Sequence, residues 1–265
     1  MAGSLDLPEL IAVDVDGTIA GADHVPSART VAALRRLAGC GIAGVIVTGR
    51  SERSVLRLAD ELGFTAPQIS CNGALITVPA THERIWQRSM APADARRAVA
   101  AAHRAGATPC VWSADAWYTD EDTPGSRLLT TILEEPPVMG PLDDVIAQVA
   151  VVKVMIAGEP DTLDASGLAG VIPGMERSMS WFFEAAPAGA GKKEAMEFLL
   201  DHLHVDPQAA WGFGDGGNDV GWLGLLGRVF APENARDEVK AMADQVIGHH
   251  ASDGVAEFLE RTLGV

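Results

Sequence analysis

The sequence predicts an α/β fold, in which a doubly wound, Rossmann-like parallel sheet forms the core and a second α/β domain is inserted into it. Two observations support this prediction. Short apolar runs that end in polar residues alternate with stretches of helical periodicity toward both ends of the chain, a pattern typical of β-α-β units. Between residues 88 and 184 the pattern changes to short alternating strands and Pro/Gly clusters, without a strand-end carboxylate motif. We therefore expect a core made of residues 1–87 and 185–265 and an inserted domain over 88–184.

The composition limits the class of protein. A chain of 265 residues is long enough for one large or two modest domains, and 48% hydrophobic with 21% charged residues argues against disorder. The formal net charge of −16 argues against nucleic acid or an anionic membrane as a partner. Neither a basic leader segment nor an apolar stretch of roughly 20 residues is present, so we expect a cytoplasmic protein. We expect a monomer or a homodimer, between which the sequence does not choose. The cysteines show no spacing typical of a disulfide framework or a zinc site.

The first strand is predicted at Leu10–Val13, and two carboxylates, Asp14 and Asp16, follow it directly. In open α/β sheets, ligands bind outside the carboxyl ends of the strands, so these side chains are expected in that crevice. Two carboxylates so close repel each other unless a cation lies between them, and Mg²⁺ prefers such hard oxygen ligands. The alternative is an Asp-rich turn without a ligand. Helical spacing then predicts a helix over residues 27–38.

The second strand is predicted over residues 42–47 and ends in Thr48-Gly49-Arg50. The Thr48 hydroxyl could donate to a phosphoryl oxygen, and the helix that opens at Ser51 would point its N-terminal N–H groups the same way. The alternative is that Thr48 only caps that helix. Arg50 could bind a substrate or pair with a carboxylate, and the sequence does not separate these roles.

The third strand, over residues 68–71, ends in Asn72-Gly73, a dipeptide that most often marks a tight hairpin turn. In the inserted domain, Lys153 stands in an apolar strand, on the face opposite Val152, Val154 and Ile156. We consider two roles for Lys153: a ligand-facing charge, and the commoner solvated lysine on an exposed sheet face. The other strands expected here are 110–112, 116–119 and 149–157, and the helices are 92–105, 126–134 and 142–148.

After a strand at 181–184, Lys192 opens a helix that continues to residue 203. A lysine at a helix start is unfavourable for the helix dipole, so it requires a partner such as a carboxylate or a phosphate. A further apolar strand over 209–213 ends in a glycine-rich loop that presents the side-chain oxygens of Asp215, Asn218 and Asp219. Such a set of oxygens suits a hard octahedral cation.

In the last part of the sequence, we expect a strand that begins at residue 229, then a helix that ends at 243, a strand at 245–247 and a helix over 253–263. Asn234 lies between the first two of these elements. From the residues alone, it is interpreted as the N-cap of the helix that follows.

These motifs together resemble those of the haloacid dehalogenase-like (HAD) hydrolases, most of which are phosphatases. D-x-D-G-T at Asp14, T-G-R at Thr48, the lysine at 192 and G-D-x-x-N-D at Asp215 occur in the family's order. The insertion is similar in place and size to the cap of the Cof-type and sugar-phosphatase branch. The resemblance implies hydrolysis of a small phosphorylated metabolite, such as a sugar phosphate, with the cap closing over the site and selecting the leaving group.

The resemblance also implies a two-step phosphoryl transfer. Asp14 would be the nucleophile, and Asp16 would donate a proton to the leaving group and later accept one from water. Thr48 and Lys192 would hold the phosphoryl oxygens. Lys193 follows where many relatives have glycine, which leaves two candidates for this lysine, with Lys192 favoured.

The cofactor implied by the resemblance is Mg²⁺. Its expected ligands are Asp14, Asp16 through its main-chain carbonyl, Asp215 and Asp219. The expected substrate contacts are Gly49, Arg50, Asn72, Gly73, Lys153, Asn218 and Asn234.

Two other functions remain open at this point. A hexose phosphomutase of the same branch would share the motifs and would differ in needing a bisphosphate activator. A non-catalytic phosphosugar-binding protein would have no need of a nucleophile and an acid together. A response-regulator receiver also uses acidic strand ends, but it is about half this length and lacks the insertion.

Overall fold

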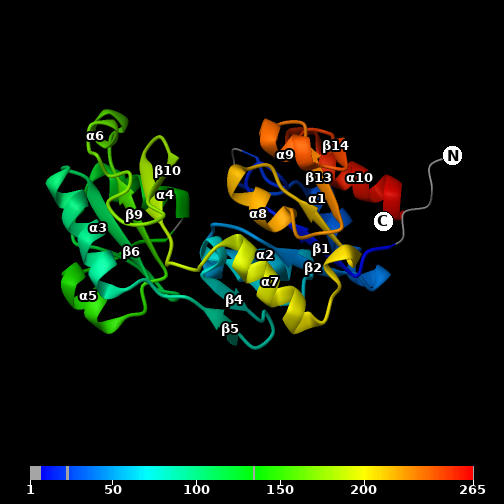
Figure 1. Ribbon diagram of the computed structural model, residues 1–265, viewed down its shortest axis with the longest axis horizontal. Helices are drawn as coiled ribbons and strands as arrows, with labels where there is room; N and C mark the ends of the chain where they lie inside the picture. The colour runs from blue at the N-terminus through cyan, green and yellow to red at the C-terminus, as the bar shows by residue number, and fades with distance from the viewer. Residues whose placement is uncertain (1–6, 22–23, 134, 265) are drawn as a thin grey trace. The chain divides into compact units, whose positions relative to one another are not determined.

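The computed structural model describes residues 7–21, 24–133 and 135–264 (Figure 1). The chain divides into two compact units, which we call the core unit, Met1–Trp86 with Gly191–Val265, and the inserted unit, Gln87–Ala190. The core unit is therefore assembled from both ends of the chain, and the inserted unit is one continuous segment. None of the described helices is both long enough and apolar enough to cross a membrane.

A parallel sheet organises the core unit. Within the described residues it has five strands in the order β14-β13-β12-β1-β2. Their bounds are β1 Leu10–Val13, β2 Ala43–Ile46, β12 Ala210–Phe213, β13 Arg228–Pro232 and β14 Gln245–Ile247. Val13, the last residue of β1, lies beside Phe213 on one side and Ile46 on the other. The carboxyl ends of three neighbouring strands are thus level, and the residues that follow them meet at one edge of the sheet.

Helices cover both faces of this sheet, as a doubly wound fold requires. Ile11 and Val13 pack into one apolar core, whereas Leu10 and Ala12 pack into another, because successive side chains of a strand point to opposite faces. The first core includes residues of α1 Ala28–Arg35, α2 Glu52–Leu62 and α10 Gly254–Leu263. The second includes residues of α7 Lys192–Leu203, α8 Val220–Leu223 and α9 Asp237–Met242. The predicted fold class is confirmed.

The third predicted strand belongs to a small separate sheet. β3 Gln68–Ser70 pairs antiparallel with β4 Leu75–Thr77, and β5 Arg84–Gln87 completes the sheet. The hairpin expected at Asn72-Gly73 is confirmed, but its turn is a 3₁₀ segment, Cys71–Gly73, in which all three residues have positive φ. A bridge between Val47 and Ile69 attaches β3 to the end of β2. Neither β4 nor β5 was predicted from the sequence.

The inserted unit contains its own sheet, with the strand order β10-β11-β9-β6-β7-β8. Its strands are β6 Thr108–Trp112, β7 Trp117–Thr119, β8 Val138–Met139, β9 Lys153–Ala157, β10 Glu176–Met179 and β11 Phe182–Ala185. Its helices are α3 Pro92–Arg104, α4 Pro124–Leu133, α5 Leu142–Gln148 and α6 Pro160–Asp164. In Figure 1, α3 and α5 lie on one side of β6 and β9, and α4 lies on the other. β11 belongs to this sheet because it pairs with β9, and the core unit resumes at Gly191.

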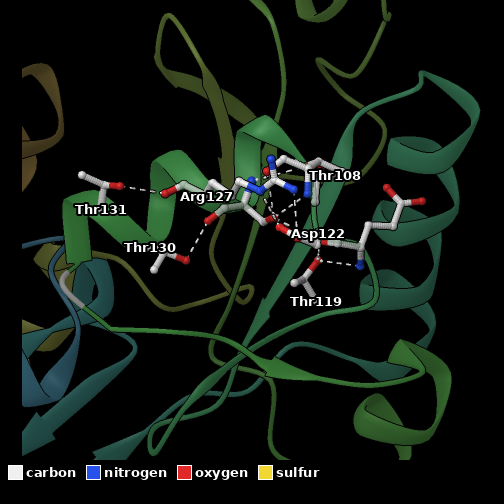
Figure 2. Close-up of polar contacts among 9 residues, drawn as sticks. Thr108, Thr119, Asp122, Arg127, Thr130 and Thr131 are labelled. Atoms are coloured by element: carbon white, nitrogen blue, oxygen red, sulfur yellow. Dashed lines mark hydrogen bonds and ion pairs between the residues drawn. The ribbon is translucent and has the colours of Figure 1, made fainter.

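One side-chain hydrogen bond joins the sheet to the segment before α4, and others lie within α4 and that segment (Figure 2). The hydroxyls of Thr108 in β6 and Thr123 before the helix lie 2.6 Å apart. Arg127 donates to both carboxylate oxygens of Asp122, at 2.8 and 2.9 Å. The Thr130 hydroxyl donates to the carbonyl four residues earlier, which lets a polar side chain sit within a helix. The sequence alone gives no sign of these contacts.

Candidate active site

The loops after β1 and β12 approach each other closely at Gly17. This residue has φ +87°, a conformation that glycine adopts without steric cost. A Cβ at Gly17 would lie only 2.4 Å from Oδ2 of Asp215, so a side chain there would displace that carboxylate. The Thr18 hydroxyl donates to Oδ1 of Asp215 at 2.9 Å. Gly17 and Thr18, which follow the first strand, therefore fix the position of the Asp215 carboxylate.

A buried lysine links two of the predicted aspartates. Lys192 Nζ lies 2.7 Å from Oδ1 of Asp14 and 2.7 Å from Oδ1 of Asp219. The three residues are 4%, 6% and 1% exposed, respectively. Lys192 is the first residue of α7, and the carboxylates supply the partner that its place near the helix start requires. Lys193 is exposed, with its Nζ 3.7 Å from Glu197 Oε1, so the structure brings Lys192 to the site.

The electrostatics of this cluster favour additional positive charge. Burial raises the pKa of Asp14 to about 7, against the opposing effect of Lys192, and the nearby Asp219 and Asp215 raise it further. Burial also raises the pKa of Asp215, with Thr18 opposing and Asp219 adding to the shift. Burial alone would lower the pKa of Lys192, but the carboxylates of Asp14 and Asp219 raise it above its usual value. One ammonium thus faces three carboxylates.

This donor set fits a hard divalent cation. Ligand atoms from Asp14, Asp215 and Asp219 lie within 4.8 Å of one another, and carboxylate oxygens are the ligands that Mg²⁺ prefers. Asp219 already accepts hydrogen bonds on both oxygens: from Lys192 Nζ and Trp222 Nε1 on Oδ1, and from the N–H groups of Asp215 and Gly216 on Oδ2. Its contacts therefore position the lysine and the loop. Asp14 and Asp215 are the better candidates for direct ligands.

The second carboxylate of the first motif has a different environment. Arg50 donates to Asp16 with Nε to Oδ2 at 2.9 Å and Nη2 to Oδ1 at 2.7 Å. His24 Nδ1 lies 2.8 Å from Oδ1. Burial opposes ionisation, but the hydrogen bonds and charge of Arg50, with a contribution from His24, lower the pKa of Asp16 below its usual value. Of the two roles considered for Arg50, the structure shows the pairing with a carboxylate. His24 was not identified as a site residue, because no motif in the sequence distinguishes it from other loop residues.

Thr48 and Asn72 lie side by side at the end of β2. Thr48 is buried, and its hydroxyl accepts a hydrogen bond from the Arg50 N–H at 3.3 Å. The N-cap of α2 is Ser51, so the interpretation of Thr48 as its cap is wrong. The N–H of Asn72 donates to the Thr48 carbonyl at 3.0 Å, and a Cβ on Gly49 would lie 2.8 Å from Asn72 Oδ1.

The turn after β3 also contacts the start of α7. A Cβ on Gly73 would lie 2.2 Å from the carbonyl oxygen of Gly191, next to Lys192. The glycine therefore permits the close approach that brings the hairpin turn and the lysine together.

The two asparagines expected to bind substrate have different surroundings. Asn234 donates through Nδ2 to the Gly17 carbonyl at 2.6 Å and accepts through Oδ1 from the His250 N–H at 3.1 Å. It thus fastens the loop after β1. Its interpretation as a helix N-cap is wrong, because the N-cap of α9 is Arg236. Asn218 is exposed on the loop after β12, and substrate contact by either residue stays a prediction.

Lys153 in the inserted unit is not a solvated lysine. It is 5% exposed, its Nζ lies 3.3 Å from Glu184 Oε1, and it stands over the ring of Trp112, 4.7 Å from the centroid. The solvated interpretation is wrong because the side chain is buried, between the Trp112 ring and the Glu184 carboxylate. A substrate contact by Lys153 stays a prediction.

Comparisons with known proteins agree with this geometry. The family model described as haloacid dehalogenase-like hydrolase matches residues 11–259. A phosphoglycolate phosphatase from Methanopyrus kandleri is 28% identical over 97% of this chain and 98% of its own length. An HMP-PP phosphatase from Klebsiella pneumoniae is 28% identical over 97% of this chain and 96% of its own. The crystal structure of a haloacid dehalogenase-like hydrolase from Bacteroides thetaiotaomicron has a TM-score of 0.86 at 25% identity, covering 96% of this chain and 99% of that one. Because the family match spans nearly the whole chain and its motif residues meet at one sheet edge, this protein belongs to the haloacid dehalogenase-like hydrolase family.

Proposed function

We propose that this protein is a Mg²⁺-dependent phosphatase that hydrolyses a small phosphomonoester, a sugar phosphate or a related phosphorylated metabolite. The observation that carries the proposal is the buried Asp14–Lys192–Asp219 array beside Asp215 at the carboxyl edge of the core sheet. Burying an ammonium group between two carboxylates costs much desolvation free energy, so such a group is weak evidence for a role in stability. A role in binding a phosphate group explains its presence better. The phosphatase names of the two relatives agree with this reading.

In the proposed reaction, the Asp14 carboxylate attacks phosphorus, and the bond from phosphorus to the leaving oxygen breaks. Because Arg50 and His24 hold the pKa of Asp16 below its usual value, Asp16 has to take up a proton as the substrate binds, and it then gives this proton to the leaving oxygen. Water then attacks the aspartyl-phosphate, Asp16 takes the proton, and the electron pair of the phosphorus–Asp14 bond returns to the carboxylate. Lys192 and the Thr48 hydroxyl hold phosphoryl oxygens. A divalent cation held by Asp14 and Asp215 would neutralise charge between nucleophile and phosphate.

The test of this function is phosphate release from a panel of sugar phosphates, nucleotides and phosphoglycerates, with Mg²⁺ or with a chelator. We expect release from at least one compound, and we expect the chelator to abolish it because the excess carboxylate charge would repel the phosphate. Absence of release from every compound by folded, Mg²⁺-loaded protein would contradict the proposal. A requirement for a bisphosphate activator would indicate a phosphomutase instead.

The pKa of Asp14 predicts how Mg²⁺ binding depends on pH. Since this pKa is raised to about 7, Asp14 of the metal-free protein holds a proton below that pH and must release it when the cation binds. We expect the Mg²⁺ affinity to fall roughly tenfold from about pH 8 to about pH 6. Calorimetric titrations in buffers of different ionisation enthalpy would measure the affinity and the released protons. Equal affinity at both pH values, without proton release, would contradict the expectation.

A further inference from the structure

His24 adopts a backbone conformation that is uncommon for a residue with a side chain. Its φ is +58°, in the left-handed region, where histidine occurs more often than most residues but glycine is favoured. Two hydrogen bonds hold it there: its N–H donates to the Gly21 carbonyl at 2.9 Å, and its own carbonyl accepts from Arg50 Nη2 at 2.8 Å. The result is that the imidazole returns to the carboxylate of Asp16, eight residues earlier in the chain.

Together, Arg50 and His24 fix the orientation of this carboxylate. An ionised carboxylate only accepts hydrogen bonds, so His24 donates through its Nδ1–H. Oδ1 of Asp16 accepts from His24 and from Arg50 Nη2, and Oδ2 accepts from Arg50 Nε. Of the about four lone-pair positions of a carboxylate, three are thereby used, and the remaining one is on Oδ2.

Stability does not explain the contact between His24 and Asp16. The two side chains are 42% and 39% exposed, and an ion pair so accessible to solvent adds little to stability. The left-handed backbone conformation of His24 costs more free energy than its exposed contact with Asp16 contributes. Strained backbone of this kind is concentrated at functional sites, where the geometry itself is needed.

We propose that His24 is a positioning residue for Asp16 in the second half of the reaction, when Asp16 takes a proton from the water that attacks the aspartyl-phosphate. This inference rests on the proposed function. The observed arrangement holds the carboxylate in one orientation with an acceptor position on Oδ2 left for a water proton. A base fixed in this way acts faster than one that must search several rotamers, because the orientation is set before reaction.

The test uses p-nitrophenyl phosphate, whose leaving group is a stable anion and departs without a proton from Asp16. Rapid-quench kinetics on the Mg²⁺-loaded protein separate formation of the phosphoryl-enzyme from its decay. For His24→Ala we expect decay to slow by about tenfold, part of the 10²–10⁴ that a general base provides, while the rate of formation stays within about twofold of wild type. Turnover should then show a burst of p-nitrophenolate.

Three further variants make the result specific. His24→Asn keeps an N–H donor near the place of Nδ1 and tolerates positive φ, so it should restore decay to near the wild-type rate. His82→Ala removes an exposed histidine of the same φ, +58°, from the core unit and should change neither rate. In an Asp16→Asn background, His24→Ala should slow decay no further, since it acts through Asp16.

The outcomes separate the two proposals. Formation and decay slowed equally by His24→Ala, decay unchanged, or additive effects in the Asp16→Asn background would each overturn the role of His24 and leave the phosphatase function standing. A wild-type protein that forms no phosphoryl-enzyme from p-nitrophenyl phosphate would overturn the proposed mechanism, and the role of His24 with it.

Discussion

Replacing Asp14 with asparagine is expected to lower phosphate release by at least about 10⁴-fold, the scale seen when a nucleophile is removed. An amide cannot form the aspartyl-phosphate, so the first covalent step is lost. The protein should remain folded, because asparagine has nearly the same size and Lys192 keeps its contact with Asp219 at 2.7 Å. Phosphate release and intact-mass spectrometry of acid-quenched enzyme would measure both effects, since only the wild type should gain the mass of a phosphoryl group.

A matched control is Asp60→Asn, which makes the same change at an exposed position of α2 in the same unit. It should keep the wild-type rate and the mass shift. If Asp14→Asn still released phosphate at a rate near wild type, or still acquired the phosphoryl mass, Asp14 would not be the nucleophile.

Replacing Lys192 with methionine is expected to lower the free energy of unfolding by about 3–5 kcal/mol, the usual cost of removing one partner from a buried ion pair. Methionine fills much of the space but leaves Oδ1 of Asp14 and of Asp219 without the ammonium that now lies 2.7 Å from each. Phosphate release should fall by at least about 100-fold, because the phosphoryl oxygens lose a buried cation. Denaturant unfolding of the metal-free protein and the phosphate assay would measure the two losses.

Lys193→Met is the control for that experiment. Lys193 is the next residue of α7, and its 3.7 Å contact with Glu197 is about half exposed, so its loss should cost less than about 1 kcal/mol. Equal losses of stability and activity in the two variants would show that Lys192 has no special place in the site.

The central strands and the polar residues after them could be predicted from the sequence. An apolar run followed by Asp14, and another followed by Asp215, carries the signal of a buried parallel strand in a few consecutive residues. The strands that escaped prediction, such as β4, β5 and β10, are three or four residues long. Predicted strands such as β1 and β3 are equally short, but β5 and β10 are partly exposed and contain charged residues, so they lack the apolar run that indicates a buried strand.

Which of the two adjacent lysines, Lys192 or Lys193, reaches the site depends on the geometry of α7 as well as on the sequence motif. Neighbouring residues of a helix point about 100° apart, so only one of two adjacent lysines can face the sheet edge. The sequence favoured Lys192 by its motif alone. The structure shows the reason: Lys192 is the first residue of α7, where the helix meets the turn that contains Gly73.

The sequence by itself determined which kinds of residue stand at the strand ends and in which order, because hydrophobic periodicity and turn signals are local. Only the tertiary structure decided which of these residues meet. Lys192 and Asp14 are 178 positions apart, and Asn234 lies 217 positions from Gly17. His24 reaches Asp16 through a loop whose carbonyl Arg50 holds, and Lys153 is buried against Trp112 and Glu184, which come from other strands. Such contacts arise when separate elements pack together, and no local pattern encodes the partner that packing supplies.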